Sequence, residues 1–381
     1  MPVQLESFQI WRIKLPAGRE IGDNMCRYSS FTTVVLALHS TDGSVGWGFG
    51  SRVTEGTFRR PVSWHVDVPA LPRLRSRFES EHWSRLKGRA PLELFNDDRW
   101  KCCGNDLLAG AVRSALWDLQ AKEKNVPLYD LLGSRRRESV PAYVSYLEFP
   151  LSDTQAANFY RQSVSSGSKA IKVKVGHTDP HRDLDRLRLV RDETQGQLEI
   201  AIDANLGWSA KETLENISLF SSAGIELAYV EDPMPIDDVQ GYQLLAKELP
   251  IDVVGHDYAS APADLRPLLD VGGIQRLRVH TSFDYALDVA QLADEYALPL
   301  IVGNMTFEMG VHAAVALPRV ERIEFSDLAW NSLMKRPVGV VRGRMYPPQE
   351  PGLGREPMLE MLDKYSVSSG DKSSCSAGAH A

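Results

Sequence analysis

The stretch Ala170-Ile171-Lys172-Val173-Lys174-Val175-Gly176 predicts a β-strand that presents two lysines on one face. Apolar and charged residues alternate along it, and successive side chains of a strand point to opposite faces. Lys172 and Lys174 therefore share one face, and the aliphatic side chains share the other. A half-exposed strand with solvated lysines has the same pattern, so the stretch alone is compatible with an exposed or an enclosed lysine pair.

Two further predicted strands follow at regular spacing, and both end in polar residues. The strand over residues 198–203 ends at Asp203, with Asn205 two residues beyond, and the strand over residues 227–231 ends at Glu231. A helix-like segment follows each strand. Lysines and acids at the ends of successive strands are the layout expected for a parallel barrel with its chemistry at the carboxyl ends of the strands.

From residue 139 onward, strands and helices alternate. Asp179-Pro180 and the capping box Ser209-Ala210-Lys211-Glu212 mark two of the helix starts. Eight strands with helical crossovers favour a closed barrel over an open sheet, although periodicity alone does not distinguish the two. The predicted strands lie near residues 140–147, 170–175, 198–203, 227–231, 251–255, 274–280, 299–303 and 321–326.

The first part of the chain predicts a separate α+β unit. Strands are predicted over residues 8–15, 32–39 and 45–49, with Asp42-Gly43 in a hairpin turn. Residues 16–30 are predicted as a long polar loop. Residues 75–124 have a helical pattern, which is clearest over the last 18 of them.

The motifs in and after the lysine strand resemble those of one known family. Lys-x-Lys at 172–174, Asp-Ala-Asn-Leu-Gly-Trp at 203–208 and Val-Glu-Asp-Pro at 230–233 stand in the order found in the mandelate racemase branch of the enolase superfamily. The resemblance covers nearly the whole chain, and residues 111–119 and 127–133 share it. It implies an α/β fold, namely a modified TIM barrel, (β/α)7β, with an N-terminal α+β capping domain.

The resemblance also implies a division of the chain. The capping domain would comprise residues 1–125, and the barrel would comprise residues 126–330. A C-terminal segment over residues 331–365 would pack back on the capping domain. Residues 366–381 are rich in Ser, Gly and Ala and are expected to be a disordered tail.

Removal of the proton α to a carboxylate gives an enediolate, and a divalent cation held by carboxylates stabilises its charge. Hard oxygen ligands suit Mg²⁺, which is the expected cofactor. The resemblance implies Asp203 and Glu231 as the first two metal ligands. The family's third ligand falls on His256, which is a poorer Mg²⁺ ligand than a carboxylate, so the adjacent Asp257 is kept as a candidate as well.

The lysine face provides the expected base. Lys174 matches the family's proton-abstracting lysine, and Lys172 would lower the pKa of Lys174 by like-charge repulsion while it faces the substrate carboxylate. Asn205 returns to the face of Asp203, where it could bind the substrate or cap the following turn. Arg27 and Tyr28 lie in the long N-terminal loop and are candidates for substrate specificity.

The opposite side of the site departs from the family. The usual histidine on the seventh strand is replaced by Asn304, and the usual aspartate on the sixth is replaced by His280, which could itself act as an acid or base or be a structural histidine. Arg278 shares the inward parity of His280 and could bind a second anionic group of the substrate or form a buried salt bridge. Glu308 matches an acid that donates a hydrogen bond to the substrate carboxylate.

Composition excludes several classes of protein. The 381 residues are 43% apolar and 24% charged, which is typical of a globular chain, and the net charge of -7 argues against a nucleic-acid partner. No targeting segment or membrane-spanning run is found, so a cytoplasmic location without a membrane partner is expected. The four cysteines are expected to be free thiols. The family implies a homo-oligomer.

The leading hypothesis is a Mg²⁺-dependent lyase that dehydrates an acid sugar, an aldonate or aldarate, to a 2-keto-3-deoxy acid. Lys174 would remove the α-proton, and His280 would protonate the departing hydroxyl. A racemase, epimerase or cycloisomerase is the second hypothesis, because His280 could be a second base. A barrel that binds an acidic ligand without turnover is the third, because the third metal carboxylate and the usual dyad are missing.

Overall fold

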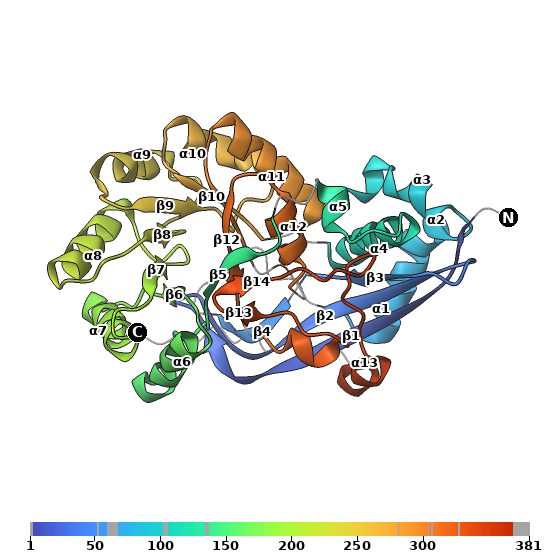
Figure 1. The fold of residues 1–381 in the computed structure, drawn as a ribbon, viewed down its shortest axis with the longest axis horizontal. Coiled ribbons are helices and arrows are strands. Elements are labelled where there is room, and N and C mark those ends of the chain that lie inside the picture. Colours follow the sequence, from blue (N-terminus) through green and yellow to red (C-terminus); the bar gives the residue numbers. More distant parts are fainter. Residues whose placement is uncertain are drawn as a thin grey trace.

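The computed structural model describes residues 3–51, 53–58, 68–101, 106–133, 137–280, 282–303, 305, 308–326 and 328–368. Eight of its strands form a parallel barrel (Figure 1), in which each strand pairs with the next and the last pairs with the first. The predicted closed barrel is therefore confirmed. Its strands are β5 (Val140–Val144), β6 (Ala170–Lys174), β7 (Glu199–Asp203), β8 (Tyr229–Glu231), β9 (Asp252–Gly255), β10 (Arg276–Val279), β11 (Leu300–Val302) and β12 (Val320–Phe325).

A helix follows each of the first seven barrel strands, which is the (β/α)7β pattern. The predicted start signals hold, because Asp179 accepts a hydrogen bond at the start of α7 and Ser209 forms a capping box with Glu212 at the start of α8. The helices are α6 (Asp153–Ser165), α7 (Pro180–Glu193), α8 (Ala210–Ser222), α9 (Val239–Glu248), α10 (Arg266–Asp270), α11 (Phe283–Glu295) and α12 (Gly310–Ala316). A short η3 (Pro262–Leu265) precedes α10.

The N-terminal unit is an antiparallel sheet covered by helices. Its core lies between the strands and α4, and the glycines of β3, Gly46 and Gly48, let this helix approach the sheet closely. The strands are β1 (Leu5–Gly22), β2 (Cys26–Ser40), β3 (Val45–Phe49) and β4 (Val53–Phe58). The helices are α1 (Leu71–Phe78), η1 (Glu79–Trp83), α2 (Ser84–Leu86), α3 (Pro91–Phe95), η2 (Asp98–Trp100), α4 (Leu107–Glu123) and α5 (Tyr129–Leu132).

The prediction of a long loop over residues 16–30 is wrong. Strands β1 and β2 continue through this region as one long hairpin, and only three residues, 23–25, separate them. Asp23 closes the turn, because its Oδ1 accepts the backbone N–H groups of Met25 at 2.7 Å and Cys26 at 3.0 Å. A register shift between Pro16 and Ile21 interrupts the pairing, and this irregularity hides the strand period in the sequence.

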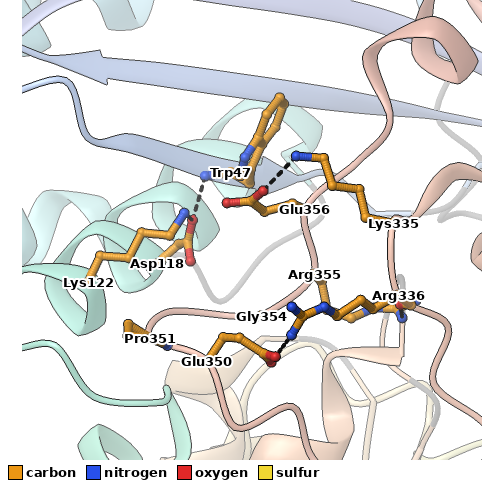
Figure 2. Close-up of a pocket in the computed structure, with 10 residues that line it drawn as sticks. All are labelled: Trp47, Asp118, Lys122, Lys335, Arg336, Glu350, Pro351, Gly354, Arg355 and Glu356. Atoms are coloured by element: carbon orange, nitrogen blue, oxygen red, sulfur yellow. Dashed lines mark hydrogen bonds and ion pairs between the residues drawn. The ribbon is translucent and has the colours of Figure 1, made fainter.

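The C-terminal segment joins the N-terminal unit to the barrel. It contains η5 (Trp330–Leu333), β13 (Val340–Val341), β14 (Arg344–Met345) and α13 (Leu359–Tyr365), and β14 pairs with barrel strand β5. Asp118 of α4 is buried and accepts the backbone N–H groups of Trp47 and Leu353, so it joins three segments that are distant in sequence. Figure 2 shows this junction, where a cavity of about 350 Å³ lies beside Asp118.

The domain boundaries stay a prediction, and residues 369–381 of the predicted tail lie outside the described residues. Within the described part of the chain, no helix is both long and apolar enough to cross a membrane.

Candidate active site

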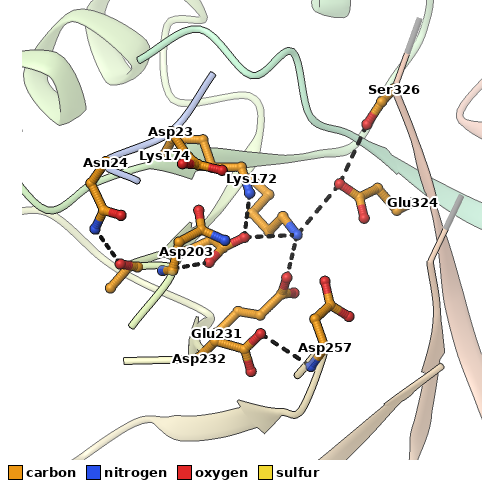
Figure 3. Close-up of polar contacts among 12 residues, drawn as sticks. Asp23, Asn24, Lys172, Lys174, Asp203, Glu231, Asp232, Asp257, Glu324 and Ser326 are labelled. Atoms are coloured by element: carbon orange, nitrogen blue, oxygen red, sulfur yellow. Dashed lines mark hydrogen bonds and ion pairs between the residues drawn. The ribbon is translucent and has the colours of Figure 1, made fainter. Parts of the chain in front are cut away.

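The lysine face of β6 points into the barrel. Lys172 and Lys174 are buried, with 1% and 6% of their surface exposed, which excludes the alternative of solvated lysines on an edge strand. The Nζ of Lys174 lies 2.5 Å from Oδ2 of Asp203, and the Nζ of Lys172 lies 3.3 Å from the same atom. Lys172 also forms an ion pair with Glu231 (Figure 3). Because parallel strands end at one rim, the predicted lysines and acids meet there.

Arg278 of β10 completes this charged cluster from the other side of the barrel. Its Nε lies 2.5 Å from Oδ1 of Asp257 and 3.2 Å from Oε1 of Glu231. One terminal nitrogen donates to the hydroxyl of Tyr143 at 2.7 Å, and the other pairs with Glu324 of β12. Arg278 is therefore a buried salt-bridge partner, the second of the two roles that the sequence left open.

Glu324 and Tyr143 were not predicted as members of the site. Lys172 Nζ lies 3.4 Å from Oε1 of Glu324, so this acid contacts both halves of the cluster. Glu324 lies near the end of the eighth predicted strand, and the pattern of acids at strand ends, applied there, would have found it. Tyr143 has no such signal, because an inward tyrosine in a strand is usually part of the core.

The cluster contains more carboxylates than cations. Three cationic side chains face five acids, so the cluster has an excess of two negative charges when all groups are ionised. The cations are Lys172, Lys174 and Arg278, and the acids are Asp203, Glu231, Asp232, Asp257 and Glu324. Two positive charges from one divalent ion would balance this excess.

The chemistry of the acids fits such an ion. Carboxylate oxygens of Glu231, Asp232 and Asp257 all lie within 4.8 Å of one another. Burial raises the pKa of Glu231 to about 8 and that of Asp232 well above its usual value. Within the described part of the chain, Glu231 Oε2 and Asp232 Oδ1 are buried without a hydrogen-bond partner. A set of oxygen donors is what Mg²⁺ prefers.

His256 contacts groups at the edge of this cluster. Its Nε2 lies 3.3 Å from the carbonyl oxygen of Met234, and its Nδ1 accepts the backbone N–H of Tyr258 at 3.2 Å. Burial lowers the pKa of His256 to about 4, so the ring is neutral near pH 7. Its Nδ1 is 3.5 Å from Asp232, but this nitrogen already accepts a hydrogen bond. The next residue, Asp257, is the one that enters the carboxylate group.

His280 and Lys174 lie on opposite sides of the barrel mouth. His280 follows β10, the sixth barrel strand, and Lys174 ends β6, the second, and strands four positions apart face each other in an eight-stranded ring. The imidazole Nδ1 lies 3.2 Å from Oδ1 of Asp257, and 29% of the His280 side chain is exposed. A ligand held between these two strands would have a lysine on one face and a histidine on the other.

Asn205 lies beside the cluster in a left-handed backbone conformation, with a φ of 41°. Its backbone N–H donates to Oδ1 of Asp203 at 2.9 Å, and its side-chain amide donates to the hydroxyl of Tyr258 at 3.2 Å. Asn205 therefore both closes the turn after β7 and binds a partly buried tyrosine that the sequence did not single out.

The tip of the β1–β2 hairpin is seated in the barrel mouth. The side chain of Asn24 donates to the carbonyl of Ala204, as Figure 3 shows. Gly176 and Gly207 make room for its amide, because a Cβ at either position would lie under 3.0 Å from Asn24 Nδ2. Both glycines follow strands that carry the charged cluster, so the N-terminal unit contacts the rim of the site through Asn24.

The contacts of the other predicted site residues do not test their predicted roles, and one of these residues is not described. Arg27 is partly exposed and 3.9 Å from Glu20, and Tyr28 is buried in the core. Glu308 is buried, and its charge acts on Arg355 of the C-terminal segment. Asn304 lies outside the described residues.

The fold and the cluster together define the class of the protein: a capped (β/α)7β barrel with cations and carboxylates at the carboxyl ends of its strands. The chain belongs to the mandelate racemase/muconate lactonizing enzyme family of the enolase superfamily. Residues 24–133 match the model of the mandelate racemase / muconate lactonizing enzyme N-terminal domain, and residues 155–361 match the enolase C-terminal domain-like model. The resemblance seen in the motifs is confirmed.

Curated relatives catalyse several reactions. An L-Ala-D/L-Glu epimerase of Clostridium acetobutylicum is 28% identical over 66% of this chain and 73% of its own length. A 3,6-anhydro-alpha-L-galactonate cycloisomerase of Streptomyces coelicolor is 27% identical over 94% of this chain and 98% of its own. An arabinonate dehydratase of Saccharolobus solfataricus is 27% identical over 68% of this chain and 72% of its own. The relatives are thus enzymes, and they include both isomerases and a lyase.

Solved structures share the whole fold. A protein of the mandelate racemase type from Mesorhizobium loti has a TM-score of 0.85 and 32% identity, over 99% of this chain and 98% of its own. The L-talarate dehydratase of Polaromonas sp. JS666, solved with Mg and L-glucarate, has a TM-score of 0.76 and 22% identity, over 96% of this chain and 97% of its own. In this chain, the carboxylate group described above offers the oxygen donors that Mg²⁺ prefers.

Proposed function

We propose that this protein uses Mg²⁺ to remove the proton α to a carboxylate, and that the reaction is the dehydration of an acid sugar to a 2-keto-3-deoxy acid. The observation that carries the proposal is the pair Lys174 and His280, which lie on opposite strands of a barrel mouth whose acids outnumber its cations. A dehydration requires a base on one side of the substrate and an acid within reach of the leaving hydroxyl.

Asp203, Glu231 and Asp257 are the proposed metal ligands, because the first two end adjacent barrel strands and Asp257 lies two residues beyond the end of the next strand, β9. Asp232 would hold Asp257 in place, since its Oδ2 accepts the backbone N–H of Asp257 at 3.2 Å. Bound Mg²⁺ supplies positive charge beside the substrate carboxylate and stabilises the enediolate. His256, with both ring nitrogens engaged, supports the loop that carries Asp257.

Lys174 is the proposed base. Burial is the largest single influence and lowers its pKa, but the nearby acids, Asp203 first and then Asp23 and Glu324, raise it, and the net shift is upward. Asp203 would hold Lys174 less strongly if it shared its charge with a cation, which would lower the pKa of the amine. Lys172 differs, because Glu231 and Glu324 outweigh burial and Arg278 and raise its pKa well above the usual value. Lys172 stays a cation that binds the substrate carboxylate.

His280 is the proposed acid. Lys174 takes the α-proton, the C–O bond to the β-carbon breaks, and the electron pair leaves with the hydroxyl group. His280 protonates this group, so that water departs and an enol remains, which tautomerises to the 2-keto acid. Asp257 lies beside this ring, with its Oδ1 3.2 Å from Nδ1.

An epimerase or cycloisomerase is the second candidate, and the same geometry favours it. If His280 returned a proton to the α-carbon from the side opposite Lys174, the configuration of that carbon would be inverted. Two of the three curated relatives described above are isomerases. In either reaction the substrate is a small carboxylate, and a homo-oligomer in the cytoplasm stays a prediction.

The test is proton NMR in deuterated buffer with Mg²⁺ and a panel of aldonic, aldaric and N-acyl or dipeptide acids. We expect a 2-keto-3-deoxy product that falls at least about 10²-fold with Lys174→Met, since a general base contributes that much or more. With His280→Gln, we expect the product to fall while α-deuterium exchange persists. Exchange without elimination in the wild type would favour the epimerase. No exchange with any acid would support a binding protein.

A further inference from the structure

Arg278 is a cation built into the group of acids that is proposed to hold the metal. Its Nε lies 2.5 Å from Asp257 Oδ1 and 3.2 Å from Glu231 Oε1, so it contacts two of the three proposed ligands. It is 3% exposed, and solvent therefore screens these contacts weakly. A divalent ion and this guanidinium would draw on the same two carboxylates.

The rest of the side chain is anchored. One terminal nitrogen donates to Tyr143 at 2.7 Å, and the other pairs with Glu324, which is itself 3.4 Å from Lys172. These two contacts come from the first and eighth barrel strands, on the side away from Asp257. A guanidinium held by both of them stays in the barrel when the acids bind another cation. Its departure would leave Glu324 as a buried acid without its arginine partner.

We propose that Arg278 is a positioning residue that sets the affinity of the acidic group for a divalent cation, by competing for the carboxylates of Glu231 and Asp257. The inference rests on the proposed metal site. With Arg278 present and all groups ionised, as they would be around a bound cation, the cluster has two surplus negative charges, which one divalent ion would balance. Without it, the surplus is three, so the acids attract the ion more strongly while the protein without metal becomes less stable.

The opposite effect is expected if Arg278 only supports the fold. A structural arginine that merely holds Asp257 in place would weaken metal binding when it is removed. The direction of the change in affinity therefore separates competition from support, and it can be measured without knowledge of the substrate.

The experiment compares Arg278→Met with Arg278→Lys, two variants of nearly equal side-chain length that differ in charge. Free Mn²⁺ is followed by electron paramagnetic resonance, and Mg²⁺ is measured by its displacement of Mn²⁺. We expect Arg278→Met to bind Mn²⁺ at least about tenfold more tightly than the wild type, and Arg278→Lys to stay within about threefold. The rise in Tm on addition of Mg²⁺ should also be largest for Arg278→Met.

Each outcome decides between the ideas. If Arg278→Met binds Mn²⁺ as tightly as the wild type or less tightly, the proposed competition is refuted, but the proposed metal site is not. No binding by the wild type, with binding by Arg278→Met, supports competition and shows that the wild-type metal site is weak. No binding by either protein overturns both proposals.

A second variant covers the case in which Arg278→Met does not fold. The double variant Arg278→Met/Glu324→Gln removes the ion pair as a unit and restores the surplus of two charges. We expect it to bind Mn²⁺ no more weakly than the wild type, because the net charge is unchanged and the competitor for Glu231 and Asp257 is gone. A loss of about tenfold or more would show that Arg278 supports Asp257 instead of competing for it.

Discussion

His312 is a buried histidine that should make the stability of the protein depend on pH. It lies in α12 with no exposed surface, and its Nε2 is 2.9 Å from the carbonyl oxygen of Leu353. Its Nδ1 has no hydrogen-bond partner within the described part of the chain. A protonated ring would therefore bury a charge and a donor without an acceptor.

The size of the effect follows from the pKa of the ring. Burial lowers the pKa of His312 from 6.5 to about 4. At about pH 5, the ring is protonated in the unfolded chain and neutral in the folded one, so protons favour unfolding. Linkage then gives a loss of about 2 kcal/mol between about pH 7.5 and about pH 5. The loss begins as the pH falls through 6.5 and is complete below about 4.

The assay is urea unfolding of the wild type and His312→Gln at both pH values, followed by tryptophan fluorescence. Glutamine is neutral throughout and can donate to Leu353, so His312→Gln should lack this part of the pH dependence while other groups titrate as before. The wild type should lose about 2 kcal/mol more than the variant on acidification. The same pH dependence in both proteins would refute the argument that the ring is neutral in the folded state.

The remaining predictions concern the contacts that seat the N-terminal unit on the barrel. Asp284→Asn removes the charge that the buried Arg113 of α4 binds through hydrogen bonds of 2.8 and 2.7 Å. Urea unfolding should then show a free energy of unfolding that is lower by about 3 kcal/mol. Asp288→Asn, on the exposed side of α11, which also carries Asp284, should lower the free energy of unfolding by under about 0.5 kcal/mol. Gly207→Ala should clash with Asn24, lower the Tm and speed proteolysis of the hairpin tip, whereas Gly110→Ala, which meets open space, should not. Equal effects within either pair would contradict the described packing.

The strands of the barrel, and the face of each strand that carries the charged side chains, could be predicted from the sequence. Residues two apart in a strand share a face, so Lys172 and Lys174 could be assigned to one side from local pattern alone. The same rule placed Asp203 and Glu231 at the rim. These predictions succeeded because each depends only on a few residues that are neighbours in the sequence.

The hairpin over residues 16–30 could not be read in this way. A register shift breaks the alternation of side chains, so the strand period disappears from the sequence. The pairing nevertheless resumes beyond the shift, where Ile21 pairs with Tyr28. The seat of Asn24 against Gly176 and Gly207 has no local signal either, because the three residues are up to about 180 positions apart. Contacts of this kind depend on how two units of the chain dock.

By itself, the sequence determined which side chains lie on the inner face of each strand and at its carboxyl end, because strand periodicity is local. Only the tertiary structure decided which cation meets which acid. Closure of the barrel sets Arg278 against Asp257, Glu231 and Glu324, and it sets His280 opposite Lys174. Ion pairing depends on distances of a few ångströms across the barrel, and the pattern along the chain does not contain those distances.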